Sequence, residues 1–277
     1  MTQPNPQSGP QSVRVAALQM VSGPEVAANL EAAGRLIAEA AAAGARLVGL
    51  PENFYLIGRE DTDKVKVAEP DGEGPIQNFL SEASRRNRVW LVAGTTPIAT
   101  ADPARIRSAC LVYDETGRRV ARYDKMHMFR FEQGEERYDE TRTLEPGTQP
   151  VAVESPFGRL ALSICYDMRF PELYRALGEF DLVFVPSAFT VPTGRAHWET
   201  LLRARAIENQ AFLVAPAQGG THATGRRTYG HTMVVDPWGE ILASRDEGEA
   251  VVLADLDFAR IKDVRARLPA LKNRRLR

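Results

Sequence analysis

Residues 159–173 have the sequence RLALSICYDMRFPEL, and this stretch contains the junction that decides the fold. A short, mainly apolar run ends at Ile164, and a helical pattern begins at Phe170 with Pro171 in its first turn. This order predicts a buried strand followed by a helix. Cys165 then lies at the carboxyl end of the strand, where free N–H groups of the turn and the helix lower the pKa of a thiol and bind an oxyanion. A lone cysteine in an apolar run is more often a core residue, so its interpretation depends on what the chain places beside it.

The composition predicts a soluble globular protein. The chain has 277 residues, of which 44% are hydrophobic, and this is enough for a sizeable core. A formal net charge of -1 argues against nucleic acid or a membrane surface as a partner held by bulk charge. No stretch approaches the roughly 18 apolar residues of a membrane span. Two cysteines are too few for a disulfide framework, and no secretion signal is recognisable, so we expect a cytoplasmic protein.

Hydrophobic periodicity predicts a single mixed α/β domain over residues 13–277. Residues 1–12 contain three prolines and no large apolar side chain apart from the first methionine, so we expect them to be disordered. Expected helices span residues 24–44, 74–88, 170–177 and 195–210, and expected strands span residues 13–19, 45–50, 89–95, 108–113, 118–123, 149–155, 158–166, 182–186, 211–217, 232–236 and 250–255. This alternation favours helices that cover sheets on two outer faces. The basic segment 261–277 is expected to be solvated, because it has no aromatic residues for base stacking.

Three functional side chains lie at the ends of predicted strands. Glu52 follows residues 45–50, Lys125 follows the second arm of a predicted hairpin, and Cys165 ends a third strand. Active-site groups collect at such strand ends in layered α/β proteins, so a carboxylate, an ammonium group and a thiol are expected to converge. Taken singly, Glu52 is more often a surface carboxylate and Lys125 a solvated lysine. Their joint placement favours a functional site.

With these residues, the sequence resembles the nitrilase superfamily of carbon–nitrogen hydrolases, whose members carry a Glu–Lys–Cys triad. The resemblance extends from about Val13 to the end of the chain, and it is carried by several specific motifs. They are Pro51-Glu52-Asn53-Phe54, Lys125 with His127 and Phe129, the segment from Cys165 to Leu173, Pro186-Ser187-Ala188-Phe189, Thr193-Gly194, Ala196-His197-Trp198-Glu199, Leu202-Arg203-Ala204-Arg205-Ala206-Ile207-Glu208 and Tyr229-Gly230-His231-Thr232-Met233-Val234-Val235-Asp236-Pro237-Trp238-Gly239.

The resemblance implies a four-layer α-β-β-α sandwich and a homodimer formed through helices near Glu172 and His197. It also implies a fourth functional residue, a second glutamate between the lysine and the cysteine. Residues 131–140 offer several acids. We expect Glu140 to be this second glutamate, because residues 140–147 resemble the family's segment around it.

The resemblance also implies a mechanism. Amide hydrolysis at neutral pH needs a nucleophile, a proton shuttle and a group that stabilises the charge on the carbonyl oxygen. Cys165 is the expected nucleophile, Glu52 moves the proton, and Lys125 with the backbone N–H of Tyr166 stabilises the oxyanion. The resulting thioester is hydrolysed by a water that Glu52 deprotonates. Glu140 helps to place the substrate or keeps Lys125 and Glu52 in register.

Other chemistries fit these residues less well. A papain-like Cys–His pair has four histidines available, but it leaves Glu52 and Lys125 without roles, and His127 is expected to pack or hydrogen-bond behind the lysine. His197-Trp198-Glu199 imitates the His-x-Glu of zinc deaminases, yet their paired cysteines are absent, so no metal and no cofactor is expected. A non-catalytic interaction protein on the same scaffold is expected to lose a triad residue, and a nucleic-acid-binding module needs a basic surface.

Within the superfamily the motifs look most like the deaminated-glutathione amidases, which split transaminated glutathione into 2-oxoglutarate and cysteinylglycine. The sister group of omega-amidases, which act on 2-oxoglutaramate, is the alternative. Both substrates carry a 2-oxo acid carboxylate, and the larger one has a second carboxylate at its glycine end. The cationic segment 221–229, with Arg227 and Tyr229, is our hypothesis for part of that recognition, and a plain surface loop is the alternative.

Asp167 and Arg169 flank the proposed nucleophile. They are expected to pair with each other or with Glu172. We favour this structural role for Asp167, and for Arg169 both pairing and substrate binding remain open.

Overall fold

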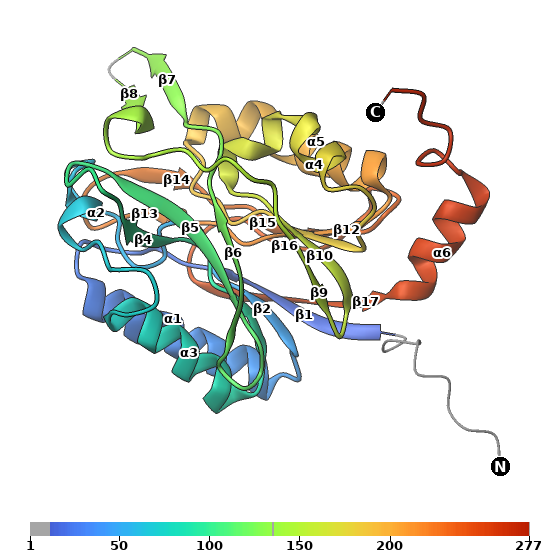
Figure 1. The fold of residues 1–277 in the computed structure, drawn as a ribbon, viewed down its shortest axis with the longest axis horizontal. Coiled ribbons are helices and arrows are strands. Elements are labelled where there is room, and N and C mark those ends of the chain that lie inside the picture. Colours follow the sequence, from blue (N-terminus) through green and yellow to red (C-terminus); the bar gives the residue numbers. More distant parts are fainter. Residues whose placement is uncertain (1–11, 135, 277) are drawn as a thin grey trace.

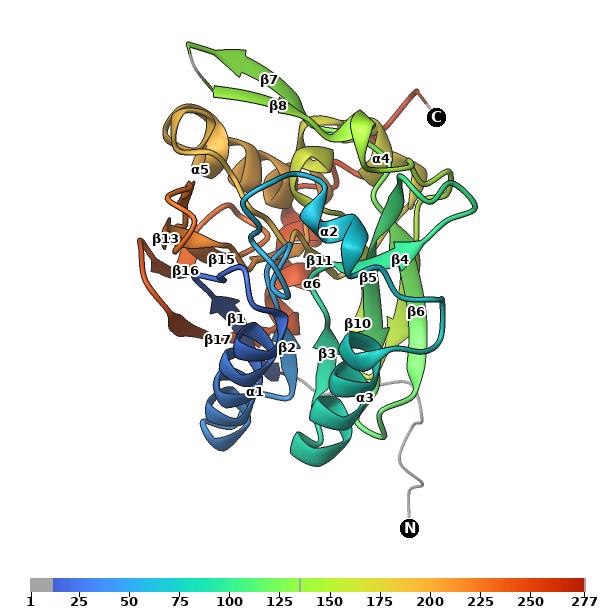
Figure 2. The ribbon, with the colours of Figure 1, turned by 90° about the vertical axis from the view of Figure 1, so that its left-hand side faces the viewer.

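The computed structural model describes residues 12–134 and 136–276 (Figure 1). Two β-sheets pack face to face, with two helices outside each sheet (Figures 1 and 2). The outer helices are α1 (Val26–Ala42) and α3 (Pro75–Asn87) on one side and α4 (Pro171–Ala176) and α5 (Val191–Asn209) on the other. The expected four-layer sandwich is therefore confirmed. Of the segment 1–12, which was predicted to be disordered, residues 1–11 lie outside the described residues, and Ser12 opens the first strand.

The first sheet has the order β17-β1-β2-β3-β5-β4, with β6 paired to β5. Its strands are β1 (Ser12–Gln19), β2 (Leu47–Gly49), β3 (Trp90–Val92), β4 (Thr96–Ala99), β5 (Ile106–Tyr113), β6 (Arg119–Asp124) and β17 (Ala250–Asp257). β1, β2 and β3 run parallel, and the other pairs are antiparallel. The carboxyl ends of the parallel strands therefore meet at one edge.

The second sheet has the order β16-β15-β12-β11-β10-β9. Its strands are β9 (Ala152–Ser155), β10 (Gly158–Leu162), β11 (Leu182–Phe184), β12 (Phe212–Ala215), β15 (Thr232–Val235) and β16 (Ile241–Arg245). Here β10, β11 and β12 are parallel. Two small hairpins lie outside the sheets: β7 (Arg130–Gln133) with β8 (Glu136–Asp139), and β13 (Gly219–Thr221) with β14 (Arg227–Tyr229).

The core follows from the alternation of side chains along each strand. Val15 and Ala17 of β1 belong to the hydrophobic cluster that the two sheets share, whereas Leu18 belongs to the cluster formed with α1 and α3. The sheets approach closely at Gly49 of β2, where an added Cβ atom would lie 2.6 Å from the ring of Phe184. This contact requires glycine, because the other sheet's aromatic ring occupies the space that a side chain would need.

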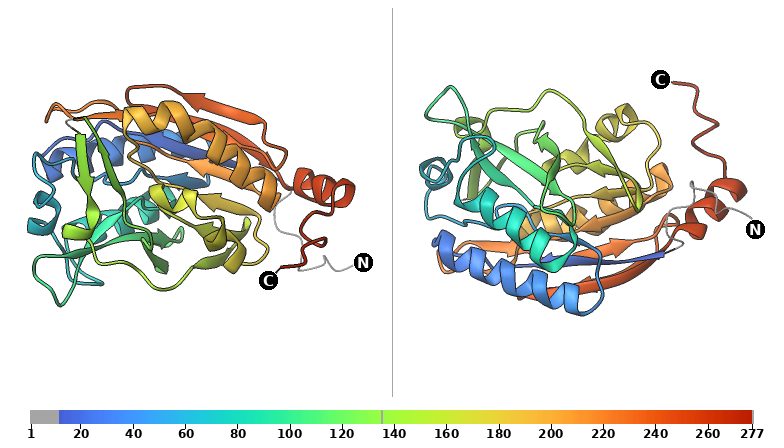
Figure 3. Two further views of the ribbon diagram at one scale, coloured as in Figure 1. Left: turned by 90° about the horizontal axis from the view of Figure 1, so that it is seen from above. Right: turned by 60° about the horizontal axis from the view of Figure 1, so that its bottom comes forward.

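The basic segment 261–277 was expected to be solvated, and most of its described residues are exposed. Its first part, however, belongs to helix α6 (Phe258–Arg267), which extends past the end of the two sheets (Figures 1 and 3). Asp257 caps this helix by accepting a hydrogen bond from the N–H of Ala259. Ile261 and Val264 are buried, and this pair at helical spacing was the overlooked signal.

Two element boundaries near the site also differ from the prediction. α5 begins at Val191 rather than at residue 195, because Pro192 is accommodated in its first turn. β10 ends at Leu162, so Cys165 does not follow the strand directly but opens a short 3-10 helix, η2 (Cys165–Arg169). Within residues 12–134 and 136–276, no helix has both the length and the apolar character needed to cross a membrane.

Candidate active site

The three residues singled out at strand ends come from both sheets. Glu52 lies in the turn after β2, Lys125 follows β6 directly, and Cys165 opens η2 beyond β10. All three side chains are buried: relative exposure is 3% for Glu52, 1% for Lys125 and 7% for Cys165. The structure therefore brings the carboxylate, the ammonium group and the thiol to one end of the sandwich.

The turn that holds Glu52 has a constrained backbone. Asn53 adopts a left-handed conformation with φ of 55°, and its N–H donates a hydrogen bond of 2.8 Å to Oγ1 of Thr95. Gly94 packs against this turn so closely that an added Cβ atom would lie 2.1 Å from the carbonyl oxygen of Pro51. Because Gly94 has no side chain, the backbone at residue 94 can pack against Pro51 and hold the turn in place. The turn then directs Glu52 toward Lys125.

Lys125 is held between two carboxylates. Its Nζ lies 2.8 Å from Oε1 of Glu52 and 2.8 Å from Glu140. Glu140 opens the 3-10 helix η1 (Glu140–Arg142), and its second oxygen accepts a hydrogen bond of 2.7 Å from the N–H of Phe129. The segment 131–140 thus supplies the second glutamate at Glu140, the residue selected from the sequence.

The side chains in this cluster shift one another's pKa values. Burial lowers the pKa of the Lys125 ammonium group, but the charges of Glu140 and Glu52 outweigh burial and hold that pKa well above its usual value. Burial raises the pKa of Glu140, but Lys125 and then Lys64 outweigh burial, and the pKa is lowered. Lys125 is therefore a permanent cation at neutral pH.

Cys165 is set apart by its backbone and by its pKa. Its φ of 49° is unusual for a residue with a side chain, and its N–H donates to the carbonyl oxygen of Pro186 at 2.9 Å. Burial, and then the charge of Glu52, raise the pKa of the thiol well above its usual value, although Lys125 opposes this shift. The sequence-based expectation of a lowered thiol pKa is wrong, because the thiol is buried beside the carboxylate of Glu52. A base must remove its proton before it can attack.

Asp167 joins the segment of Cys165 to that of Lys125. Fully buried, it accepts hydrogen bonds from the hydroxyl of Tyr123 at 2.7 Å and from the N–H of His127 at 3.0 Å. Nδ1 of His127 lies 2.7 Å from the same carboxylate, and its ring stacks on Phe170. The expected pairing of Asp167 with Arg169 or Glu172 is therefore wrong, whereas its structural role and the packing of His127 are as expected.

A small cavity of about 30 Å³ lies at Cys165. Its lining includes Tyr166, whose backbone N–H was expected to stabilise the oxyanion, and Arg169, for which substrate binding was one of the two expected roles. The guanidinium group of Arg169 lies over the rings of Tyr166 and Phe189 at 5.6 and 5.5 Å, its Nη1 lies 3.3 Å from Nδ1 of His197, and its Nε is buried without a hydrogen-bond partner. Arg169 thus has an unpaired donor at the cavity.

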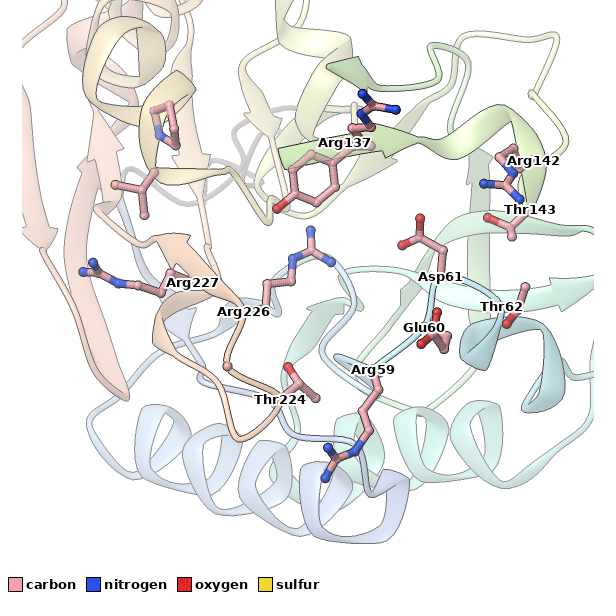
Figure 4. A pocket seen from close by; sticks show the side chains of 15 residues that line it. Arg59, Glu60, Asp61, Thr62, Arg137, Arg142, Thr143, Thr224, Arg226 and Arg227 are labelled. Atoms are coloured by element: carbon pink, nitrogen blue, oxygen red, sulfur yellow. The ribbon is translucent and has the colours of Figure 1, made fainter. Parts of the chain in front are cut away.

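A second, much larger cavity of about 810 Å³ opens outside the first (Figure 4). It is lined by the loop from Gly58 to Thr62, by residues around Tyr138 and Arg142, by the start of α5, and by residues 224–227. Arg226 lines both cavities. Sequence reasoning missed Arg226, although it had singled out the segment that contains it.

The two residues chosen from that segment lie elsewhere. Arg227 lines only the outer cavity, and its side chain is 56% exposed and lies 3.8 Å from Glu247. Tyr229 stacks on His231 with ring centres 3.8 Å apart and packs against Gly194 of α5. Neither residue lines the cavity at Cys165, and their role in substrate binding stays a prediction. Adjacent residues in an extended hairpin point to opposite sides, and composition alone does not reveal which one faces the cavity.

Metal ligation is a further possibility for clustered acids and histidines. In the described part of the chain, no group of three or more His, Cys, Asp or Glu residues is arranged to hold a metal ion.

A four-layer sandwich with a buried cysteine, lysine and glutamate cluster at one end defines the class of carbon–nitrogen hydrolases. Residues 14–266 match the family model described as carbon-nitrogen hydrolase. Deaminated glutathione amidase of Synechocystis sp. is 43% identical over 265 residues, covering 94% of this chain and 97% of its own length. The human deaminated glutathione amidase is 38% identical over 268 residues, with coverages of 94% and 82%.

The fold is similar to that of a solved member of the nitrilase superfamily. The crystal structure of Saccharomyces cerevisiae Nit3, a member of branch 10 of the nitrilase superfamily, superposes with a TM-score of 0.85 at 32% identity, covering 96% of this chain and 97% of that chain. The chain belongs to the carbon–nitrogen hydrolase family. The protein is accordingly a hydrolase that acts on carbon–nitrogen bonds.

Proposed function

We propose that this protein is a thiol-dependent amidase that hydrolyses deaminated glutathione to 2-oxoglutarate and cysteinylglycine. The observation that carries the proposal is that Glu52 and Glu140 line one cavity with Cys165, and that both lie 2.8 Å from the ammonium group of Lys125. The names of the relatives that are 43% and 38% identical support the choice of substrate.

In the first half of the reaction, Glu52 takes the proton of the Cys165 thiol as the sulfur attacks the amide carbonyl carbon. The new S–C bond places negative charge on the carbonyl oxygen, and Lys125 with the backbone N–H of Tyr166 stabilises that charge. As the C–N bond breaks, Glu52 gives the proton to the departing amine of cysteinylglycine. The 2-oxoglutaryl group remains as a thioester on Cys165.

In the second half, Glu52 takes a proton from water, and the water oxygen attacks the thioester carbonyl carbon. The C–S bond then breaks, 2-oxoglutarate leaves, and the proton returns to the sulfur. Glu140 takes no proton in this scheme. Glu140 and Glu52 each accept a hydrogen bond from the ammonium group of Lys125 and hold that group in position.

Arg169 is the residue we propose for the 2-oxo acid carboxylate. Its Nε donor is buried at the cavity without a partner, so a carboxylate there would gain a charge-assisted hydrogen bond. The aromatic rings of Tyr166 and Phe189 hold its guanidinium plane.

We further propose that the protein acts as a homodimer in the reducing cytoplasm, where its free thiol is maintained. Ile207 of α5, Trp238 and Leu268 are 46%, 49% and 48% exposed, and a second copy would remove these apolar side chains from water. Light scattering at micromolar protein concentration tests this proposal, and a monomer at that concentration would contradict it.

The substrate assignment is tested by kcat/KM for deaminated glutathione and for 2-oxoglutaramate, with Cys165→Ala as the matched control. We expect turnover of both by the wild type, a higher kcat/KM for deaminated glutathione, and none by the variant. A higher kcat/KM for 2-oxoglutaramate would favour the omega-amidase function. Equal rates for wild type and Cys165→Ala would rule out the thiol mechanism.

A further inference from the structure

The outer cavity has no role in the chemistry described so far. Its lining contains five arginines, Arg59, Arg137, Arg142, Arg226 and Arg227, but only two carboxylates, those of Glu60 and Asp61 (Figure 4). Of these five arginines, only Arg137 and Arg227 have a guanidinium nitrogen within 4 Å of a carboxylate oxygen among the described residues. An excess of unpaired guanidinium groups around a large cavity favours an anionic ligand.

Arg226 stands out among these arginines. It lines the small cavity at Cys165 as well as the outer one, so it lies at their junction. Its guanidinium carbon lies 5.2 Å from the ring centre of Tyr138, and its Nε is buried without a hydrogen-bond partner. Oγ1 of Thr224, in the same loop, is also buried and unpartnered. Buried donors of this kind are costly to leave unsatisfied, and a ligand carboxylate satisfies them.

The two cavities differ in the part of a substrate that they can hold. The inner cavity, at about 30 Å³, is far smaller than the outer one, at about 810 Å³, so the larger part of a peptide-like amide has more room in the outer cavity. In the proposed reaction the acyl group stays on Cys165 while the amine departs first. The departing half must therefore lie on the solvent side, in the outer cavity, when the C–N bond breaks.

These observations point to Arg226 as a residue that determines specificity, and this inference rests on the proposed function. We propose that Arg226 binds the terminal carboxylate of the departing cysteinylglycine, and thereby makes the enzyme prefer deaminated glutathione to 2-oxoglutaramate. The leaving group of 2-oxoglutaramate is ammonia, which has no carboxylate for Arg226 to bind. Arg169, which lines only the inner cavity, is left for the 2-oxo acid end.

The test changes both the side chain of residue 226 and the carboxylate of the substrate. Wild type, Arg226→Gln and Arg226→Lys are assayed with deaminated glutathione, with its analogue whose glycine carboxylate is a carboxamide, and with 2-oxoglutaramate. Arg86→Gln, an equal charge change on the exposed face of α3, is the control. Arg227→Gln tests the neighbour that the sequence had suggested. Thermal unfolding of each variant monitors folding.

We expect Arg226→Gln to lower kcat/KM for deaminated glutathione by about 10- to 100-fold, the range of a charge-assisted pair. For the carboxamide analogue and for 2-oxoglutaramate the loss should be under about 3-fold, since neither offers the carboxylate. Arg226→Lys should recover part of the preference. Arg227→Gln should cost less than Arg226→Gln with deaminated glutathione.

Three outcomes would overturn the inference. They are an equal loss with all three substrates, a wild type that hydrolyses the carboxamide analogue as fast as deaminated glutathione, and a larger effect of Arg227→Gln than of Arg226→Gln. Each of them leaves the proposed function intact, provided that the wild type turns over deaminated glutathione. Absence of that turnover would instead overturn the proposed function, and the inference with it.

Discussion

The inner and outer cavities differ in how their charges are paired. Glu52 and Glu140, which line the inner cavity, both contact the ammonium group of Lys125 at 2.8 Å. The outer cavity is lined by loops and hairpin ends, and most of its arginines have no carboxylate within 4 Å among the described residues. The paired cluster of Lys125, Glu52 and Glu140 suits a fixed reaction. Arg169 at the inner cavity and Arg226 at the junction of the two keep unpaired donors, which suit the recognition of a substrate's charged ends.

Loss of Lys125 should have the largest effect, because it removes the cation from the inner cluster. Lys125→Met leaves Glu52 and Glu140 buried without a counter-charge, so kcat/KM should fall by about 10²–10³ or more. Stability should fall by about 3–5 kcal/mol, as for other buried pairs that lose one partner. Urea unfolding and steady-state kinetics measure the two effects. Lys66→Met, at an exposed pair with Asp63, is the control and should cost under about 1 kcal/mol.

Glu140→Gln should have a smaller effect, and one that depends on pH. The folded-state pKa of Glu140 is lowered from about 4.5, so its ionised form stabilises the folded state at pH values above 4.5. This contribution should decrease as the pH falls below about 4.5 and vanish below the lowered folded pKa. The stability difference between wild type and Glu140→Gln, measured by urea unfolding, should therefore be largest near neutral pH. A difference that grows in acid would contradict this account of the cluster.

Arg59→Gln should have the smallest effect, since Arg59 lines only the outer cavity. Long-range attraction by an exposed charge is screened by salt. We expect KM for deaminated glutathione to rise about two- to three-fold at low ionic strength and to be unchanged at about 0.5 M salt. A fall in kcat as large as that of Lys125→Met would mean that the two cavities are not separate in function.

The inner site was largely predictable from the sequence. Glu52, Lys125 and Cys165 were placed by their positions at the ends of predicted strands, and the structure brings them together as expected. Cys110, in the expected strand 108–113, is fully buried in β5. The two cysteines differ in their neighbours, since the charges of Glu52 and Lys125 act on the pKa of Cys165, while the pKa of Cys110 is raised by burial alone.

The outer cavity was much less predictable. Its walls come from segments distant in the chain, among them residues 58–62, 137–143 and 224–227, and no local pattern states that they meet. Within residues 224–227 the choice between Arg226 and Arg227 depended on the direction of each side chain in a hairpin. The pKa of Cys165 also depended on its burial and on the approach of Glu52, which only the folded chain produces.

The thioester on Cys165 is the central claim, and acid quenching followed by mass spectrometry tests it most directly. Wild type mixed with excess deaminated glutathione and quenched within the first turnovers should carry one 2-oxoglutaryl group, on the peptide that contains Cys165. Cys165→Ala should carry none, and Cys110→Ala should carry as much as the wild type. An acyl group on any other residue, or rapid turnover by Cys165→Ala, would contradict the account.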